Sequence, residues 1–529
     1  MKKAKVFMNQ VLVAAAVMCG ALPAFARANK YVAAGWEFAE TDIDGLLQRA
    51  EAFDKTALDG CVLYLTAKGT DGQNLTTRNI LHQRAWTDAD FKSVLPKYRQ
   101  LLAHQAFRHS FLNSYRAPTN RVAWTDDAAW ARAGDNLAVL AWLAKAGGLK
   151  GLAGDFEEYH KLGQYKYKPK EDPPYPESAR LARRRGREVF AKAFAAYPEM
   201  TVLFYQLFTQ HAGYQGCRDV EARAREWKDL WPSFCVGIVE AATPQAKLVD
   251  GDETTGYLCE AATGDFYRQA AYQTTGALGF LPPELRSKYR AQLSVSFGLY
   301  IDEYTISDPK SHWYRGPVDG SRLTHFERNL AQACEAADEY VWIWAQAGKW
   351  VDWPQVRSRE LDGYRRWEEQ LPGVEAMLVR ARDPNRTTVQ LMERMKAAGT
   401  FRNLVTAKTA TGAWLAVKNV VPDERYGIVV SAKGPGAIPQ VVWRKDGEWN
   451  WNLPRAVPES TLPDEDGLCR LCTVATVPDG ADELVLQLNA RIGPDERLDM
   501  TYGDGCFFIS VSYTNNSLYG LGGIRVLEQ

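Results

Sequence analysis

The chain is poor in histidine and in the motifs that mark many hydrolytic centres. Seven histidines are scattered over 529 residues, and none belongs to a His-Glu-x-x-His motif. No Gly-x-Ser-x-Gly elbow stands beside a plausible histidine and acid, and no glycine-rich phosphate loop is evident. These absences argue against a zincin-type metalloprotease, a serine hydrolase and a nucleotide-binding enzyme. The sequence predicts no cofactor and no metal centre.

An excess of charge of either sign is also missing. The 64 Lys and Arg residues balance 64 Asp and Glu residues, so the formal net charge is zero. Binding to nucleic acid or to an anionic membrane surface depends on a concentrated positive charge. We therefore expect neither partner.

Long hydrophobic runs are scarce, and the one at the start of the chain is too short to span a bilayer. The run Val11–Met18 follows Lys2, Lys3 and Lys5 and precedes Ala24-Phe25-Ala26. A basic start, a short apolar core and a small-x-small site are typical of a secretory signal peptide. The sequence predicts a signal peptide over 1–26, cleavage near Ala26, and a secreted or periplasmic product without membrane insertion.

Strand-like and helix-like segments alternate through the first two thirds of the chain. Helices are expected between the strands, one of them over Val220–Ala241. Such alternation favours parallel strands joined by right-handed crossovers, and eight units close into a (β/α)8 barrel. The sequence predicts an α/β fold, with a catalytic TIM barrel over 27–355. The eight predicted strands are Tyr31–Phe38, Gly60–Thr66, Ala106–Asn113, Leu149–Asp155, Met200–Leu207, Ala246–Asp252, Ser294–Asp302 and Tyr340–Ala345.

The last third of the chain has a different pattern. A polar helical linker is expected over 356–400, broken at Leu371-Pro372-Gly373. Short alternating runs separated by turn residues then predict an all-β sandwich over 401–529. These runs are Ala413–Val417, Tyr426–Ser431, Gln440–Arg444, Cys469–Thr476, Glu483–Asn489 and Cys506–Tyr513.

Three segments of this region, Tyr426–Ser431, Val441–Trp443 and Val474–Pro478, resemble jelly-roll carbohydrate-binding modules of secreted polysaccharide-degrading enzymes. The chain has 17 Trp, 24 Tyr and 20 Phe. Aromatic rings pack well on the apolar C–H faces of sugars, although most rings in any protein fill its core. Trp443, Trp449 and Trp451 are candidates for sugar stacking.

Acidic residues follow three of the predicted barrel strands. Asp155 and Glu157 end the fourth strand, Asp252 and Glu253 the sixth, and Asp302 the seventh. Active sites of such barrels lie at the C-terminal ends of the strands, so these carboxylates are expected to meet. Glycosidic bond cleavage needs an acid that protonates the leaving oxygen and a second carboxylate that attacks or activates water.

Polar and aromatic residues at the other strand ends complete the predicted site. They are candidates for binding a carbohydrate substrate, through stacking on the rings and hydrogen bonds to hydroxyl, carboxylate or sulfate groups. These residues are Trp36, Asn113, Arg116, Trp342, Trp344 and Gln346.

The segments Gly148–Tyr159, Lys247–Glu253 and Glu339–Trp344 resemble secreted bacterial glycoside-hydrolase-like (β/α)8 proteins, over roughly 31–353. The resemblance implies hydrolysis of glycosidic bonds in a poly- or oligosaccharide. Retaining barrel glycosidases commonly carry the acid after strand four and the nucleophile after strand seven, which implies Glu157 with Asp302 or Glu303. Barrels resembling α-galactosidases use acids after strands four and six, which implies Asp155 with Asp252 or Glu253.

We favour Glu157 as the general acid/base with Asp302 as the second carboxylate, and keep Asp252 and Glu253 as rival partners. Phe156 stands where the first pattern has asparagine, so the choice stays open, as does retention or inversion. The main alternative is a non-catalytic secreted glycan-binding protein on the same scaffold. A metal-assisted hydrolase using His160 with Asp155 and Glu157, and a structural protein of the cell surface, are further alternatives. The oligomeric state is not indicated.

Overall fold

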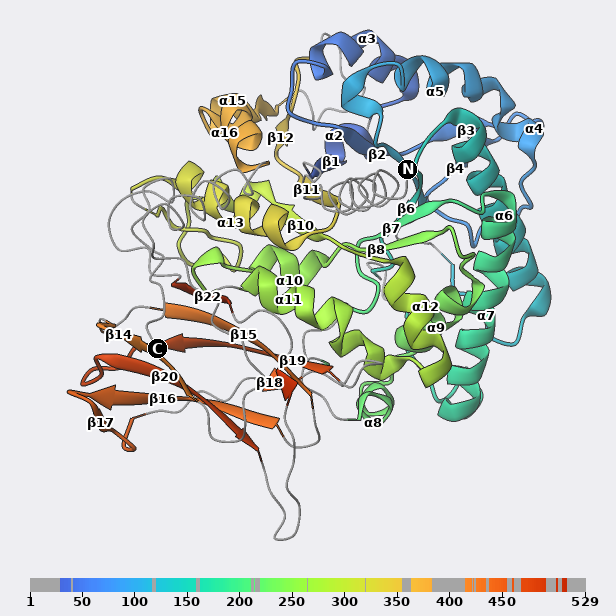
Figure 1. The fold of residues 1–529 in the computed structure, drawn as a ribbon. Coiled ribbons are helices and arrows are strands. Elements are labelled where there is room, and N and C mark those ends of the chain that lie inside the picture. The colour runs from blue at the N-terminus through green and yellow to red at the C-terminus, as the bar shows by residue number, and fades with distance from the viewer. Residues whose placement is uncertain are drawn as a thin grey trace, which may run out of the picture.

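The computed structural model confirms the closed parallel barrel. It describes residues 29–39, 41–116, 120–157, 162–210, 214, 219–263, 265–318, 320–353, 363–382, 414–420, 422, 425–433, 437–453, 459–460, 468–490, 501–502 and 507–510. The predicted signal peptide, most of the linker and His160 lie outside them. Strand order runs β10-β11-β1-β2-β5-β6-β7-β8-β9, with every neighbouring pair parallel (Figure 1). The strands are β1 Lys30–Gly35, β2 Gly60–Leu63, β5 Phe111–Tyr115, β6 Gly151–Gly154, β7 Thr201–Phe204, β8 Lys247–Asp250, β9 Leu293–Val295, β10 Phe297–Tyr300 and β11 Tyr340–Ala345.

The barrel closes through a strand that is interrupted at Ser296. β9 pairs with β8, β10 pairs with β11, and only Ser296 separates β9 from β10 along the chain. The side chain of Gln273 replaces the missing ladder bonds: its Nε2 donates to the Ser296 carbonyl at 3.0 Å, and its Oε1 accepts from the Ser296 amide at 3.4 Å. The two segments are therefore one seventh barrel strand, and the ring has the eight predicted strands.

Helices surround the sheet as expected. The predicted helix Val220–Ala241 is two helices, α8 and α9, because Lys228 has a φ of 56° and the Asp229 carboxylate accepts from the Trp231 amide. A non-glycine residue with positive φ cannot continue a right-handed helix. The helices on the barrel are α2 Trp36–Ala39, α3 Ile43–Phe53, α4 Asp88–Phe91, α5 Leu95–Leu101, α6 Asp127–Gly147, α7 Tyr175–Ala196, α8 Val220–Glu226, α9 Trp231–Ala241, α10 Glu253–Leu258, α11 Asp265–Thr274, α12 Pro283–Gln292 and α13 Arg322–Ala336.

None of the described helices combines the length and the apolar character that a membrane span needs.

Shorter elements complete this part of the chain. The short strands are β3 Thr66–Lys68, β4 Asn74–Thr76, β12 Gly348–Lys349 and β13 Arg365–Arg366, and the 3-10 turns are η1 Lys92–Val94, η2 Gln105–Phe107, η4 Ala261–Thr263, η5 Gly276–Phe280 and η6 Ile301–Tyr304. Of the predicted linker, α15 Trp367–Gln370 and α16 Val374–Ala381 flank the break at Leu371-Pro372-Gly373.

Two glycines explain how the chain enters β6. Gly148 ends α6 with a φ of 87°, in the left-handed region that favours glycine at a helix C-terminus. Gly151 opens β6 with a φ of 154°, and a Cβ there would lie 1.9 Å from the Thr201 carbonyl oxygen of β7. The close approach of β6 to β7 therefore depends on glycine.

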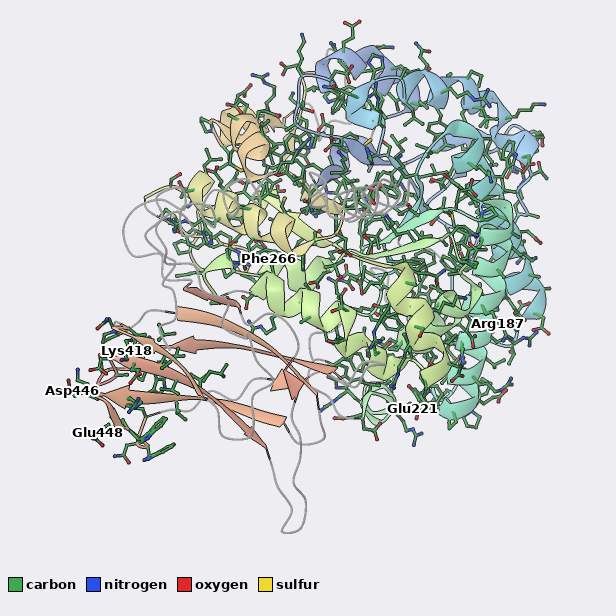
Figure 2. All side chains as sticks on the ribbon, viewed as in Figure 1. Arg187, Glu221, Phe266, Lys418, Asp446 and Glu448 are labelled. Atoms are coloured by element: carbon green, nitrogen blue, oxygen red, sulfur yellow. The ribbon has the colours of Figure 1, made fainter. Side chains whose placement is uncertain are left out.

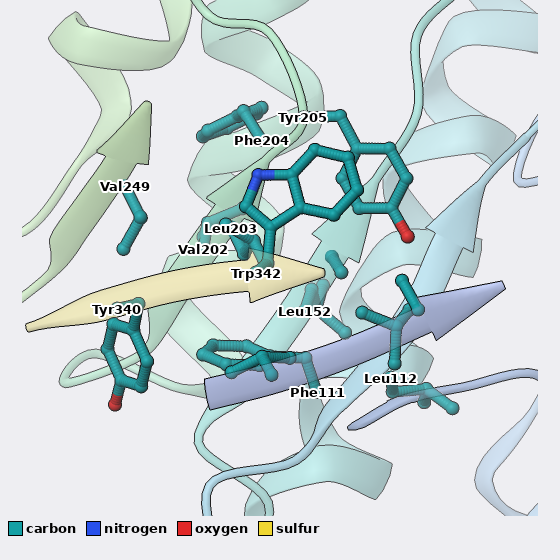
Figure 3. Close-up of a cluster of buried hydrophobic side chains, with 14 of the residues drawn as sticks. Phe111, Leu112, Leu152, Val202, Leu203, Phe204, Tyr205, Val249, Tyr340 and Trp342 are labelled. Carbon is teal, nitrogen blue, oxygen red and sulfur yellow. The ribbon is translucent and has the colours of Figure 1, made fainter. Parts of the chain in front are cut away.

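Large aromatic side chains fill the barrel interior. Trp342 of β11 stacks on Tyr205, which follows β7, with ring centroids 4.2 Å apart (Figure 3). Near the opposite end of the strands, Phe111 of β5 contacts Tyr340 of β11 edge to face at 5.4 Å. All four rings are almost fully buried. These layers form a packed core beneath the C-terminal ends of the strands.

The end of the chain forms two antiparallel sheets, which is compatible with the predicted β-sandwich (Figure 1). One sheet has the order β14-β20-β16-β17; the other has β18-β19-β15-β21, with β22 also paired to β15. Four of the six predicted runs lie within these strands; of Ala413–Val417 and Cys506–Tyr513, residues 414–417 and 507–510 do, and the rest lies outside the described residues. The jelly-roll resemblance stays a prediction. The bounds are β14 Trp414–Lys418, β15 Arg425–Lys433, β16 Ala437–Lys445, β17 Glu448–Trp449, β18 Glu459–Ser460, β19 Leu468–Thr476, β20 Glu483–Ala490, β21 Thr501–Tyr502 and β22 Phe507–Ser510.

Because Gln273 is fully buried and holds both backbone groups of Ser296, we expect Gln273→Ala to destabilise the barrel. Lost hydrogen bonds together with unsatisfied buried groups correspond to about 2–4 kcal/mol of unfolding free energy. Chemical denaturation, compared with Gln100→Ala at an exposed position of α5, measures the effect. Equal midpoints for the two variants would show that Gln273 does not support the closure.

Candidate active site

Three carboxylates meet at the C-terminal ends of β6 and β8. One oxygen from each of Asp155, Glu157 and Glu253 lies within 4.8 Å of the other two. Asp155 and Glu253 are buried, and Glu157 is half-buried. The sequence prediction that acids from different strands gather at one end of the barrel thus agrees with the positions of these three residues.

The Asp155 carboxylate is oriented by its own loop and by an arginine. Its Oδ1 accepts from the Glu157 amide at 3.0 Å, and its Oδ2 lies 4.0 Å from Nε of Arg116. The Asp155 amide donates to the Tyr115 carbonyl at 2.9 Å, which extends the β5–β6 pairing by one bond. The start of this loop is therefore fixed to the barrel.

Arg116 lies among aromatic rings. Its guanidinium carbon is 4.4 Å from the ring centroid of Trp36, 5.2 Å from Trp344 and 5.6 Å from Tyr64. A cation over aromatic faces is stabilised by the ring quadrupoles, more so when water is excluded. Only 8% of the Arg116 surface is exposed, so its positive charge acts mainly on the neighbouring acids.

The environment of Glu253 favours the protonated form of its carboxyl group. Burial raises the pKa of Glu253 well above its usual value, and the charges of Asp155 and Glu157 raise it further. A hydrogen bond from the Tyr257 hydroxyl to Oε1, 3.2 Å long, and the charge of Arg116 act in the opposite direction. A protonated carboxyl group beside ionised ones is the arrangement that general acid catalysis requires.

The neighbouring acids of the sixth strand end face away from this cluster. Asp250 accepts from the amides of Leu207 and Phe208 and from the Thr209 hydroxyl, so it holds the loop after β7. Asp252 is fully buried with a φ of 43°, and burial and the charge of Asp250 raise its pKa well above the usual range. Of the two rival partners in this segment, only Glu253 joins the cluster.

Asp302 and Glu303 are engaged elsewhere. Asp302 accepts from the amides of Gln346 and Ala347 at 2.9 and 2.7 Å, and burial raises its pKa to about 6. Glu303 pairs with Arg315 at 2.9 Å. The pairing of Glu157 with Asp302, favoured on sequence grounds, is thus not supported by this geometry, because Asp302 holds the loop after β11.

The predicted binding residues divide into two groups. Trp36, Arg116 and Trp344 lie beside the cluster, and the half-buried Gln346 accepts from the Tyr300 hydroxyl at 2.8 Å. Trp342 and Asn113 have no exposed surface. Trp342 donates to the Gly251 carbonyl at 2.8 Å and supports Tyr205 from below, so it lies beneath the site.

Four tyrosines near the cluster escaped the sequence analysis. Tyr64 and Tyr205 follow β2 and β7, and their hydroxyl oxygens lie 3.5 Å apart. Tyr257 bonds Glu253, and Tyr300 ends β10. The rule that singled out acids at strand ends applies equally to Tyr64, Tyr205 and Tyr300, whereas Tyr257 lies one helical turn beyond Glu253 and carries no such signal.

Comparisons with known proteins leave the activity open. No family model and no curated protein matches the chain. Solved structures that it resembles include a sugar phosphate isomerase/epimerase from Parabacteroides distasonis, at 11% identity over 68% of this chain and 96% of that chain, with a TM-score of 0.30. A glycoside hydrolase is 11% identical over 87% and 92%, with a TM-score of 0.31, and AmyP in complex with maltotriose is 11% identical over 89% and 99%, with a TM-score of 0.24. Structural similarity at this level says nothing about activity. The assignment of the barrel depends on the closed parallel sheet and not on these comparisons.

The environment of Glu253 predicts opposite responses to two substitutions. Glu157→Gln removes a negative neighbour and should lower the Glu253 pKa, whereas Tyr257→Phe removes a hydrogen bond to the carboxylate and should raise it. Difference infrared titration of the carboxyl band, with isotope-labelled glutamate and Glu253→Gln to identify the signal, measures both midpoints. Shifts in the same direction would contradict this description of the cluster.

Proposed function

We propose that the protein is a glycoside hydrolase that cleaves a poly- or oligosaccharide by a retaining mechanism. The observation that carries the proposal is the close approach of the carboxylates, within 4.8 Å, at the C-terminal end of a parallel barrel. Carboxyl groups about 5–5.5 Å apart are typical of retaining enzymes, whereas inverting enzymes need roughly 6.5–9.5 Å for a water molecule.

The environments of the acids suggest their roles. Glu253, whose protonated form is favoured, donates its proton to the glycosidic oxygen. Asp155, beside Arg116, attacks the anomeric carbon as the bond to the leaving group breaks, which gives a glycosyl ester. Glu253 then takes a proton from water, the water oxygen bonds to the anomeric carbon, and Asp155 leaves as a carboxylate. In this assignment Glu157 acts on the pKa of Glu253 rather than as the acid.

The charge of the site favours a neutral sugar. Among the described residues, Arg116 is the cation beside the three carboxylates, and its Nε already lies 4.0 Å from Asp155. Uronic or sulfated residues would add negative charge beside the acids. The half-buried side chain of Trp36 offers apolar surface that suits pyranose C–H faces. We also propose, from the sequence, that the protein is exported after cleavage near Ala26.

Substitution of the two principal acids tests the roles. On a substrate found by screening aryl glycosides and polysaccharides, Glu253→Gln should lower kcat by about 10²–10⁴-fold for poor leaving groups and far less for dinitrophenolate. Asp155→Asn should lower turnover with every leaving group. The control Asp135→Asn, at an exposed position of α6, should leave turnover unchanged.

Trapping with an activated 2-fluoro glycoside and peptide mass mapping identifies the nucleophile directly. We expect the label on Asp155. A label on Glu157 would exchange the roles of these two acids, and a label on any residue outside the cluster would refute the assignment. Glycan binding without release of reducing ends would instead support the non-catalytic alternative.

The same three oxygens could hold a divalent cation, because hard cations prefer carboxylate ligands. The nearby Arg116 charge and the protonated form of Glu253 disfavour this, since cation ligands must be ionised. We therefore expect turnover to survive dialysis against EDTA, with no metal in stoichiometric amount by mass spectrometry. Loss of activity that Mg²⁺ or Mn²⁺ restores would show that the cluster is a cation site.

A further inference from the structure

Arg315 binds three segments on the C-terminal side of the barrel. Its Nη2 donates to the Tyr257 carbonyl at 2.6 Å, at the C-terminal end of α10. Its Nη1 donates to Glu260 at 3.0 Å, and its Nε donates to Glu303 at 2.9 Å. The Arg315 amide also donates to the Glu303 carbonyl at 3.2 Å. The three nitrogens of the guanidinium therefore join α10, the connection between α10 and η4, and η6.

Glu260 is itself fixed by residues of α13. Its Oε2 lies 2.6 Å from Nε2 of His325 and 3.4 Å from Nδ2 of Asn329. Nδ1 of His325 lies 2.7 Å from the carbonyl oxygen of Gly316, the residue that follows Arg315. The side chain of Arg315 is 13% exposed, so little water competes for its donors. Charged groups that satisfy one another in such a network hold a single geometry.

The helix that Arg315 holds is short and lies directly on β10. A Cβ on Gly256 of α10 would lie 2.8 Å from the carbonyl oxygen of Gly298, and a Cβ on Gly298 would lie 3.0 Å from the Tyr257 ring. Glycine at both positions therefore allows the close approach. The same helix begins at Glu253, whose carboxyl group accepts from the Tyr257 hydroxyl at 3.2 Å. Tyr257 thus contacts Arg315 through its carbonyl and Glu253 through its hydroxyl.

Aromatic rings hold the Tyr257 ring on its other sides. The ring centroids of Tyr300, Trp342 and Trp313 lie 5.5, 5.8 and 6.2 Å from that of Tyr257. Trp313 lies two residues before Arg315 on the loop between η6 and α13, so the contacts of Arg315 also place this ring. A side chain whose rotamer is locked by packing presents its hydroxyl in one direction.

We propose that Arg315 is a positioning residue for Glu253. It holds the carbonyl end of Tyr257 and the loop that carries Trp313, and so fixes the hydroxyl group that donates to the Glu253 carboxyl group. Lysine at this position would keep the positive charge but not the rigid fork of donors. The inference deepens the proposed function, on which it rests only in treating Glu253 as the proton donor.

Infrared titration of Glu253, with isotope-labelled glutamate and Glu253→Gln as the reference, tests this role without a substrate. We expect Arg315→Lys to raise the Glu253 midpoint by about 0.5–1 pH unit, because a hydrogen bond to the carboxylate is weakened while the charge at position 315 remains. The double variant Arg315→Lys/Tyr257→Phe should titrate as Tyr257→Phe does, since the effect passes through the tyrosine hydroxyl. No shift, a downward shift, or a shift that adds to that of Tyr257→Phe would overturn the proposal.

Arg185→Lys is the matched control. Arg185 on α7 donates to the Trp124 carbonyl at 3.0 Å and to two carboxylates, so it binds the same kinds of group as Arg315. Figure 2 shows Arg187 of the same helix at the outer edge of the barrel. Thermal melting should show a loss of stability in both lysine variants, whereas the Glu253 midpoint should stay unchanged in Arg185→Lys. Equal shifts of the midpoint in the two variants would indicate general loosening and would refute a specific role for Arg315.

Glu260→Gln decides the question if Arg315→Lys fails to fold. Removal of a negative charge would lower the Glu253 midpoint if charge alone acted, whereas a weaker hold on Arg315 should raise it. A rise that Tyr257→Phe abolishes supports the proposal, and a fall or no change contradicts it.

Turnover is measured separately, on the substrate found by screening. The alkaline limb of kcat/KM against pH should move upward in Arg315→Lys in parallel with the titration. Turnover by the unsubstituted protein without any shift in the titration refutes only the role of Arg315. The expected shift in a protein that turns over no substrate refutes only the hydrolase.

Discussion

The candidate site depends on the electrostatic repulsion among three carboxylates that the barrel brings together. Two unit charges 4–5 Å apart repel by about 3–4 kcal/mol at an effective dielectric constant near 20. Ionisation of all three of Asp155, Glu157 and Glu253 would be unfavourable unless a cation lay close by. Without enough nearby positive charge, one of the three binds a proton. Arg116 supplies one positive charge near Asp155. Burial and the two negative neighbours raise the pKa of Glu253, which favours a proton on this carboxyl group and so reduces the repulsion. A proton held in this way is available for transfer.

The aromatic side chains make this arrangement possible. Trp36, Trp344 and Tyr64 restrict Arg116 to one place, and Tyr205 and Trp342 fill the barrel directly beneath. Rings that exclude water also lower the local dielectric constant, which strengthens the attraction of Arg116 to Asp155 and the repulsion among the acids. The many aromatic residues thus act first through packing, and only those at the strand ends are placed to meet a ligand.

Much of the fold could be predicted because local patterns determine it. All eight barrel strands lie within or overlap the apolar runs chosen from the sequence, and so do six of the nine described strands of the C-terminal sheets, whereas β17, β18 and β21 were not predicted. The break between α8 and α9 was missed because it depends on the backbone of Lys228 and on the cap that Asp229 provides, neither of which disturbs the apolar pattern. Glu253, which lies near Asp155 and Glu157, was kept as a rival, and Asp302 was preferred to it for a different reason. Asp302 has the right residue type in the right segment, but it lies in a 3-10 turn that begins at Ile301, and its oxygens accept from two amides of the loop after β11.

Strand alternation accounts for Asp155, whereas the choice between Asp252 and Glu253 depends on the turn after β8. In parallel strands, paired residues share a face, and Gly151, Ala153 and Asp155 alternate along β6 toward the barrel interior. On β8, Val249 pairs with Leu203, which precedes the inward-facing Tyr205 by two positions. The alternation ends with β8 at Asp250; beyond it, the left-handed backbone of Asp252, with a φ of 43°, and the start of α10 at Glu253 place Glu253 in the cluster. Phe156 packs against Tyr115 and Trp231 on the outer side of the sheet. Its two neighbours in the alternation, Asp155 and Glu157, therefore lie on the inner side. Given the register, the inward position of Asp155 follows from the sequence pattern, whereas that of Glu253 depends on the backbone turn at Asp252, which the apolar pattern does not encode.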